Sequence, residues 1–205
     1  MRDSEIVRLA VAQRKKGADL LAWAFEHDPL YEMLIPEETR RARVLTWLFD
    51  RVIGYALRYG EVYTTARVEG VACWLCPGQV KLTMGRVLRS GLYATPLKMG
   101  VAAYRQFGIY MRYTEAIHEC FAPRSHWYVW AIGVAPSNQG TGIGSQLLQP
   151  VLAKSSAAGT ASYLETGIER NVRFYERHGF RVVSHGKVTG QGLPVWAMRR
   201  DSPAT

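Results

Sequence analysis

The stretch from Val134 to Ser145 has the residue types of a phosphate-binding turn. It reads V-A-P-S-N-Q-G-T-G-I-G-S and follows an apolar, β-prone segment. Glycines let a backbone approach a ligand closely, and the free amides at the start of a helix point at negative charge with the helix dipole assisting. The pattern therefore predicts a strand, a glycine-rich turn and a helix that could together bind a pyrophosphate.

Two other phosphate-binding patterns compete for the same stretch. A Walker loop would continue with Gly-Lys-Ser or Gly-Lys-Thr, which is absent here. A dinucleotide fingerprint would carry a third glycine at Ser145, with Glu165 as the acid that ends the next strand. It would also start its glycines directly after the strand and leave more chain for the rest of the sheet. This alternative, and a glycine-rich turn without a ligand, stay open as weaker interpretations.

A second stretch, Asn171 to Phe180, reads N-V-R-F-Y-E-R-H-G-F. It predicts a compact helix, with Asn171 as its N-cap and Gly179 as its C-terminal stop. Adjacent residues on a helix point about 100° apart. We therefore expect Phe174 to pack in the core while the phenol of Tyr175 faces a different environment.

The two stretches, in this order, resemble the GNAT superfamily of N-acetyltransferases. Q-x-x-G-x-G at Gln139–Gly144, after a strand ending Ile132–Val134, matches the coenzyme A pyrophosphate motif of that family. The second stretch is similar to the segment whose Asn contacts the pantetheine arm and whose Tyr lies beside the thioester sulfur. Shorter phrases over residues 139–145, 164–166, 171–180 and 195–200 look like the puromycin N-acetyltransferase branch, whose resemblance covers 127–200 well and the rest in layout.

The resemblance implies a reaction. Acetyl-CoA would be the co-substrate, and its acetyl group would move within a direct ternary complex to a primary amine of a small molecule or peptide. No metal is expected. An acyl-CoA-binding regulatory protein without turnover is the alternative function.

The resemblance also implies site residues. Tyr175 would be the general acid, and a backbone amide near Val134 would polarise the thioester carbonyl. The expected coenzyme-binding residues are Ile132, Gly133, Val134, Gln139, Gly140, Thr141, Gly142, Ile143, Gly144, Ser145, Asn171, Phe174 and Tyr175.

Glu165 is the leading candidate for the base that deprotonates the amine. It ends a strand with apolar neighbours, where a carboxylate is costly unless it has a role or a partner. The competing interpretation is an ion pair with Arg170, Arg173 or Arg177. Weaker candidates for the base are His126, His118 and water. The expected acceptor-binding residues, which flank the acceptor side of such folds, are Phe25, Tyr31, Trp127, Glu165 and Trp196.

The elements that must position these residues are expected to form one α/β (α+β) domain over residues 1–205. The expected architecture is the GNAT fold, a central mixed and mostly antiparallel sheet flanked by helices. A helical insertion at about 79–121 precedes the central strand and is expected to divide near Gly91 and Pro96. Hydrophobic periodicity predicts strands at 6–11, 61–66, 68–76, 127–134, 161–165, 180–184 and 195–199, and helices at 17–27, 37–58, 142–158 and 172–178.

Composition narrows the classes of protein. The 205 residues carry a formal net charge of +9 spread over both halves of the chain, which disfavours a nucleic-acid-binding surface. An acid-free stretch between Glu119 and Glu165 suggests either chance or a polyanionic ligand. No apolar run is long enough for a membrane span, and acids in residues 1–5 argue against a signal peptide. Cys73, Cys76 and Cys120 are expected to be free structural thiols. We expect a cytoplasmic monomer or homodimer that binds neither membranes nor nucleic acid.

Overall fold

The structure is a computed structural model that describes residues 5–202. The sequence expectation about residues 1–4 lies outside these residues. The strands are β1 (Ile6–Arg8), β2 (Gly60–Thr65), β3 (Gly70–Leu75), β4 (His126–Val134), β5 (Ala161–Thr166), β6 (Arg181–Lys187) and β7 (Pro194–Arg200). The helices are α1 (Arg14–Ala24), α2 (Pro29–Leu34), α3 (Glu38–Tyr59), α4 (Met84–Ser90), α5 (Thr95–Met99), α6 (Val101–Phe121), α7 (Ile143–Ala157) and α8 (Glu169–Glu176). Single 3₁₀ turns lie at Val11–Gln13, Leu92–Ala94 and Pro136–Asn138.

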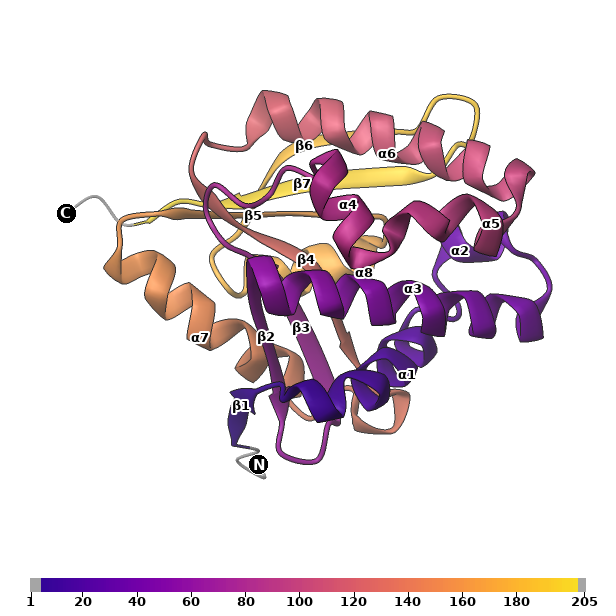
Figure 1. Ribbon diagram of the computed structural model, residues 1–205. Coiled ribbons are helices and arrows are strands. Elements are labelled where there is room, and N and C mark those ends of the chain that lie inside the picture. The colour runs from indigo at the N-terminus through magenta and orange to yellow at the C-terminus, as the bar shows by residue number, and fades with distance from the viewer. Residues whose placement is uncertain (1–4, 203–205) are drawn as a thin grey trace.

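The strands form one seven-stranded sheet in the order β1-β2-β3-β4-β5-β7-β6 (Figure 1). Every neighbouring pair is antiparallel except β4 and β5, which are parallel. The expected mixed, mostly antiparallel sheet is therefore confirmed.

The two central strands separate part-way along their length. β4 and β5 pair only from His126–Tyr128 to Ala161–Tyr163. β3 follows β4 to its end at Val134, with a bulge where Val129 and Ala131 lie opposite consecutive residues of β3. Bulges of this kind often lie next to active sites because they bend a strand and end its pairing. From Val129 to Val134, the edge of β4 that faces β5 therefore makes no β-sheet hydrogen bonds with that strand.

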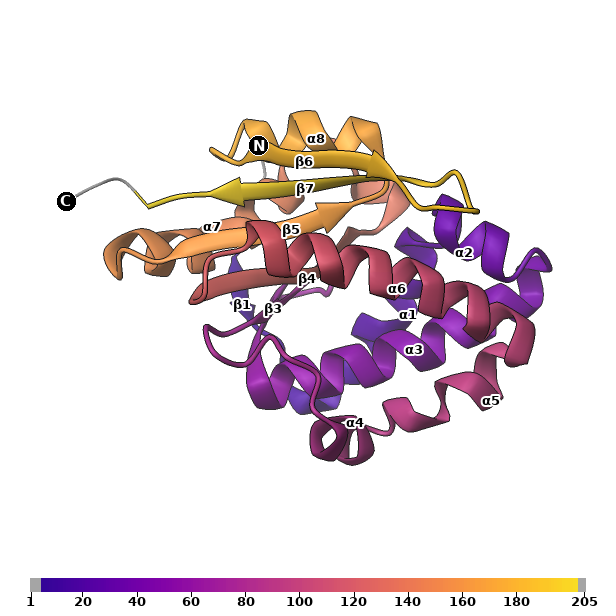
Figure 2. The ribbon, with the colours of Figure 1, turned by 90° about the horizontal axis from the view of Figure 1, so that it is seen from above.

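Helices cover both faces of the sheet (Figure 2). On one face, α1 and α3 pack on β2, β3 and β4, and α6 lies over β6 and β7. On the other face, α7 and α8 pack on the sheet and share a second apolar core with Trp127, Val129 and Leu164. The close approach of α1 requires a glycine, since a Cβ at Gly133 would lie 2.9 Å from Ala24 and Leu21 side-chain carbons.

Several expected element boundaries are corrected by the structure. The strand expected at 6–11 ends at Arg8, and Val68 lies in the β2–β3 turn with φ +58°. The break expected at Pro96 lies instead at Gly100, because proline is tolerated in the first turn of α5. An additional helix, α2, begins at Pro29 directly after Asp28, whose carboxylate accepts a hydrogen bond from the Leu30 amide at 2.9 Å.

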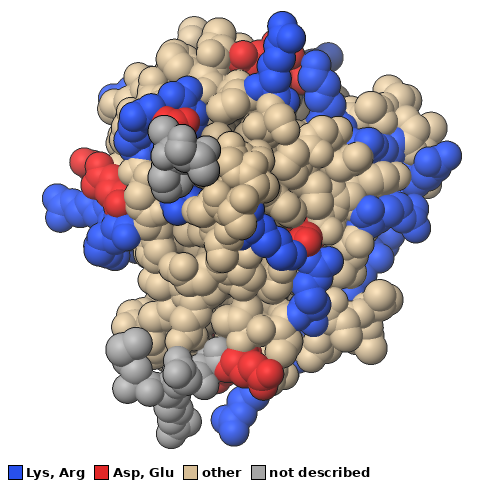
Figure 3. Space-filling model, turned by 90° about the vertical axis from the view of Figure 1, so that its left-hand side faces the viewer, with Lys and Arg blue, Asp and Glu red and all other residues tan. Residues whose placement is uncertain are grey.

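Charge and thiols follow the sequence pattern. On the face shown in Figure 3, Lys and Arg side chains form several separate groups rather than one stripe. Cys73, Cys76 and Cys120 are all free. Between residues 5 and 202, none of the helices is both long and apolar enough to cross a membrane.

Candidate active site

The glycine-rich turn lies at the end of β4 and opens directly into α7. Gly140 and Gly142 have φ values of +79° and +93°, a region that side-chain-bearing residues rarely adopt. No atom lies within 4 Å of the position that a Cβ would take at either glycine, so both face open space.

The start of α7 has free amides. Its N-cap is Gly142, which has no side chain to cap the helix. The first amides of a helix have no acceptor within the helix. In the described part of the chain, no acceptor outside the helix bonds the amides of Ile143, Gly144 or Ser145 either. Together with the open space at Gly142, these amides form a ready site for an anion.

Internal hydrogen bonds shape the turn that precedes these amides. The Thr141 hydroxyl donates to the Asn138 backbone carbonyl at 2.6 Å, and the side-chain amide of Gln139 donates to the Val134 backbone carbonyl at 3.3 Å. Ile132 and Val134 are half-buried at the end of β4, where β5 no longer pairs with it.

α8 packs beside the turn through Phe174. A Cβ at Gly144 would lie 3.3 Å from the Phe174 ring, so the absence of a side chain there lets the ring approach α7. Asn171 was expected to be the N-cap of α8, but the N-cap is Ile168 and Asn171 lies within the helix. The side-chain amide of Asn171 donates to the Thr166 hydroxyl at 3.4 Å. Gly179 has φ +82° shortly after the helix ends, as the sequence predicts for its C-terminal stop.

Tyr175 is buried on the same face of the sheet as α7. Its ring contacts Phe174 and Phe180, and its hydroxyl has no hydrogen-bond partner within residues 5–202. Burial raises the pKa of Tyr175 well above its ordinary value. The phenol is therefore a proton donor, not a phenolate, at physiological pH.

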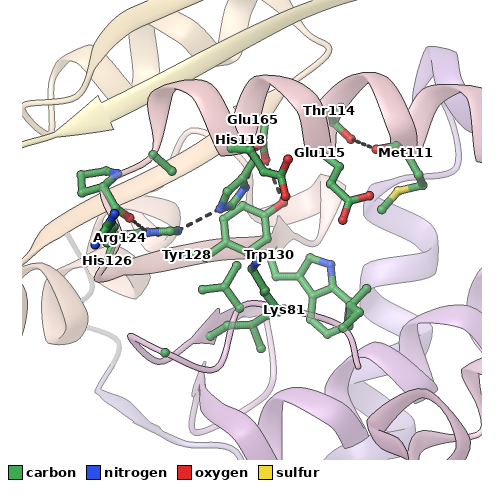
Figure 4. Close-up of a pocket in the computed structure, with 17 residues that line it drawn as sticks. Lys81, Met111, Thr114, Glu115, His118, Arg124, His126, Tyr128, Trp130 and Glu165 are labelled. Carbon is green, nitrogen blue, oxygen red and sulfur yellow. Dashed lines mark hydrogen bonds and ion pairs between the residues drawn. The ribbon is translucent and has the colours of Figure 1, made fainter. Parts of the chain in front are cut away.

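On the other face of the sheet, a chain of side chains is centred on Glu165 (Figure 4). The Tyr128 hydroxyl donates to Glu165 Oε2 at 2.8 Å, and His118 Nδ1 lies 3.0 Å from Glu165 Oε1. His118 Nε2 lies 3.0 Å from His126 Nε2, and His126 Nδ1 faces the Pro123 carbonyl. We call Glu165, His118 and His126 the relay.

The three contacts of the relay give the number of protons that it holds when every contact is a hydrogen bond. Three contacts need one hydrogen each: His126 to the Pro123 carbonyl, His126 to His118, and His118 to Glu165. Two neutral imidazoles supply only two hydrogens, and a carboxylate supplies none. The fully bonded relay therefore holds one additional proton and is electrically neutral. After losing that proton, it can accept another.

Burial changes the proton affinity of His126. His126 is 6% exposed, and its pKa is lowered by burial and then by the proximity of His118. Burial therefore favours the neutral form of the His126 imidazole. The pKa of Tyr128 is raised well above its usual range by burial and by the Glu165 charge, so Tyr128 stays a donor to Glu165.

The relay lines a cavity of about 680 Å³ under α6. Apolar side chains such as Met111, Trp130 and Leu75 form part of its wall. Four charged side chains also line it and have no ion-pair partner in residues 5–202: Lys81, Glu115, Glu119 and Arg124. Its size is that of a small-molecule site, and Figure 4 shows Glu115 and His118 projecting into it from α6.

Comparisons with known proteins agree with this architecture. Residues 100–182 match the acetyltransferase (GNAT) domain model. An uncharacterised N-acetyltransferase of Schizosaccharomyces pombe is 25% identical over 181 residues, covering 84% of this chain and 72% of that protein. A Corynebacterium glutamicum structure described as histone acetyltransferase HPA2 and related acetyltransferase superposes with a TM-score of 0.66 at 23% identity, over 98% of this chain and 96% of that one. An agmatine N-acetyltransferase superposes with a TM-score of 0.62 at 14% identity, over 96% and 98%.

This chain has the GNAT fold. In these matches the chain is similar to acetyltransferases of the GNAT family. The puromycin N-acetyltransferase branch is not among these matches and stays an expectation from the sequence.

The two groups of candidate residues lie on opposite faces of the sheet. Side chains alternate along a strand, so Leu164 packs toward α7 and α8 while Glu165 faces α6. Tyr175 shares the face of Leu164. β4 and β5 stop pairing directly after Tyr128 and Tyr163, and we call the unpaired stretch between these two strands the gap.

The other expected acceptor residues lie away from the cavity wall. Phe25 and Tyr31 form an aromatic cluster with Phe49, with ring centroids 4.9 to 6.3 Å apart. Trp127 packs on the opposite face with α7, and Trp196 stacks on His185 at 4.5 Å. Of the five expected residues, Glu165 lines the cavity and these four do not.

The partners of Glu165 were not apparent from the sequence. Within residues 5–202, none of the arginines that the competing interpretation names pairs with Glu165, and its ion-pair partner is His118. His118 is 47 residues from Glu165 and eight from His126, on different elements. No local spacing rule links such positions. Tyr128 carried a weak signal, because a tyrosine in an otherwise apolar strand needs a polar partner when buried.

Proposed function

We propose that this protein is an acetyl-CoA-dependent N-acetyltransferase that acylates a primary amine held in the cavity under α6. One observation carries the proposal. The uncapped start of α7, its glycine-rich turn and the buried phenol of Tyr175 lie on one face of the sheet, and the relay lies on the other. Between them, β4 and β5 no longer pair beyond Tyr128 and Tyr163. A thioester in this gap would have Tyr175 on one side and Glu165 on the other.

The coenzyme would bind through backbone groups. The pyrophosphate would lie on the amides of Gly140 to Ser145, where positive φ values and free amides favour an anion. The pantetheine arm would run along the unpaired edge of Ile132 to Val134 and contact Asn171. Polarisation of the carbonyl would come from the amide near Val134.

The transfer would need two proton movements. The neutral amine attacks the thioester carbonyl, an N–C bond forms, and the C–S bond breaks. The amine proton passes to the relay at Glu165 or His118, and the phenol of Tyr175 gives its proton to the departing thiolate. Solvent then removes the proton from the relay and restores the phenol.

The acceptor is proposed to be a small molecule or a peptide terminus. A cavity of about 680 Å³ encloses ligands of that size. The agmatine N-acetyltransferase that superposes on this chain acts, by its name, on a small amine. The mixed apolar and charged lining suits an amine with an apolar skeleton and a further charged group.

The test is the release of coenzyme A thiol from acetyl-CoA in the presence of a panel of monoamines, diamines, amino acids and short peptides. We expect thiol release with at least one class of primary amine and an equal amount of acetylated amine by mass spectrometry.

Two results would decide against this proposal. Tight acetyl-CoA binding without thiol release for any amine would favour the regulatory alternative. Thiol release without acetylated amine would indicate hydrolysis. The Glu165→Gln variant is the internal control, because it should retain acetyl-CoA binding while losing transfer.

A further inference from the structure

A second and smaller cavity, of about 80 Å³, lies where α1, α3 and α4 meet. Four arginines line it: Arg14, Arg51, Arg58 and Arg89. Arg14 is the first residue of α1, and Arg89 lies in the last turn of α4. Arg51 and Arg58 are two turns apart on α3, so they project from one face of that helix.

The packing of α1 on α3 directs Arg14 into this cluster. A Cβ at Gly54 would lie only 2.6 Å from the guanidinium carbon of Arg14, so the Arg14 side chain lies flat against α3 in the space that this glycine leaves. The Arg14 guanidinium also donates to the Asp50 carbonyl at 3.0 Å. The packing against Gly54 and the hydrogen bond to Asp50 therefore hold the Arg14 side chain between α1 and α3.

The cluster has far more positive than negative charge. Asp50 is the carboxylate that pairs with it, at 2.6 Å from Arg14 and 3.4 Å from Arg51. Arg58 and Arg89 have no hydrogen-bond or ion-pair partner in the part of the chain that the structure describes. The buried Nε atom of Arg51 is the atom that lies 3.4 Å from the Asp50 carboxylate, and it makes no hydrogen bond of good geometry. Like charges this close repel one another, and a bound anion would relieve that repulsion.

We propose that this arginine cluster binds a phosphoryl group, either as free phosphate or as a phosphate monoester. Guanidinium groups match the oxygens of phosphate through parallel N–H donors. A water molecule occupies about 30 Å³ in the liquid, so the cavity of about 80 Å³ has room for one tetrahedral oxyanion. None of its lining residues belongs to the glycine-rich turn, α8 or the relay, so the site is separate from the proposed coenzyme site.

The test is calorimetric titration with inorganic phosphate at constant ionic strength, with chloride as the balancing anion. Saturating acetyl-CoA is present, so that phosphate does not titrate the glycine-rich turn. We expect saturable binding by the wild type and at least a tenfold loss of affinity in the double variant Arg58→Gln/Arg89→Gln. Both side chains are exposed, so the variant should fold, and its thermal melt without phosphate checks this.

The matched control is Arg105→Gln combined with Arg43→Gln, which removes the same charge from exposed positions on α6 and α3 outside the cavity. It should bind phosphate like the wild type. A second titration with glycerol phosphate separates the two sources: tighter binding than that of inorganic phosphate indicates a phosphate monoester, and equal or weaker binding indicates the free ion.

The proposal is overturned if phosphate does not bind beyond the effect of chloride, or if the Arg58/Arg89 variant binds it as the control does. The proposal is also overturned if the wild type binds phosphate without acetyl-CoA but not with it, because the phosphate would then bind at the glycine-rich turn. The comparison of arginine variants needs no acetyl transfer, so it stands whatever the outcome for the proposed enzyme activity.

Discussion

A single carboxylate shows how burial and partners decide the chemistry of a residue. The side chain of Glu165 is 6% exposed and is held by a phenol on one oxygen and an imidazole on the other. An arginine partner would have made it a permanent ion pair. A histidine partner instead makes the pair neutral or negative according to one proton, which is what a base needs.

The relay predicts the effect of Glu165→Gln. An amide keeps the shape of the side chain but takes no proton, so kcat/KM for the amine should fall by about 10²-fold while the Kd of acetyl-CoA stays the same. The acid limb of the kcat/KM profile should disappear or move. Initial rates over a pH series measure both. The control is Glu176→Gln, an exposed position on α8, and a lower Tm with an unchanged pH profile would leave Glu165 with a structural role only.

The buried phenol gives a second prediction. Tyr175→Phe keeps the ring contacts with Phe174 and Phe180 and removes the proton for the thiolate. We expect kcat to fall by about 10²-fold with the affinity for acetyl-CoA unchanged. Because burial raises the pKa of Tyr175, the wild type should also show no loss of rate from its ionisation up to pH 10. Tyr93→Phe, at an exposed tyrosine, is the control, and unaltered turnover in Tyr175→Phe would assign the proton to water.

His126 links the relay to stability. Its pKa is lowered in the folded state from a model-compound value of 6.5, so folding favours its neutral form. Above pH 6.5 His126 is neutral in both the folded and the unfolded chain, so it does not change the free energy of unfolding. Below pH 6.5 the unfolded chain binds the proton more tightly than the folded protein, and the free energy of unfolding falls. The Tm of the wild type should therefore drop between pH 7 and pH 5 by more than that of His126→Gln. Parallel Tm curves for the two proteins would contradict this account.

At the scale of elements, the start of α7 carries the coenzyme prediction, and the chain offers a matched pair of glycines. Gly142 and Gly159 lie at opposite ends of α7, both with positive φ and open space where a Cβ would be. Alanine strains the backbone at both positions, because a positive φ favours glycine. Gly142→Ala should weaken acetyl-CoA binding by tenfold or more, while Gly159→Ala should not, although both lower Tm. Equal affinities by calorimetry would exclude the turn as the pyrophosphate site.

Elements with strong periodicity were predictable, and those fixed by tertiary contacts were not. β4, α7 and the β2–β3 hairpin follow from apolar patterns, and Gly179 ends α8 as expected. α7 runs from Ile143 to Ala157 with Pro150 inside it. The sequence does not predict α2, because Asp28-Pro29 is typical both of the end of one helix and of the start of the next. The sequence predicts Asn171 as the N-cap of α8, but the helix begins earlier, after Ile168, whose side chain makes no capping hydrogen bond.

At the scale of the whole molecule, the site exists because two distant halves of the chain meet at one gap. The glycine-rich turn and the Asn171–Phe180 stretch were recognisable because each is continuous in sequence. The cavity was not, since α6, β4 and β5 form its wall only after the sheet has assembled. The expected acceptor aromatics were inferred from their segments, whereas strand alternation decides which face each side chain takes. Trp127 therefore packs with α7, on the face opposite the cavity.

The central claim is that donor and acceptor approach from opposite faces and meet between β4 and β5. Hydrogen exchange with each ligand separately tests it most directly. Acetyl-CoA should slow exchange at the amides of residues 132–134 and 140–145. An amine selected from the panel should instead slow exchange in residues 78–82 and in the part of α6 near Glu115 and His118. Protection of the same segments by both ligands, or protection of the cavity segments by acetyl-CoA alone, would contradict this account.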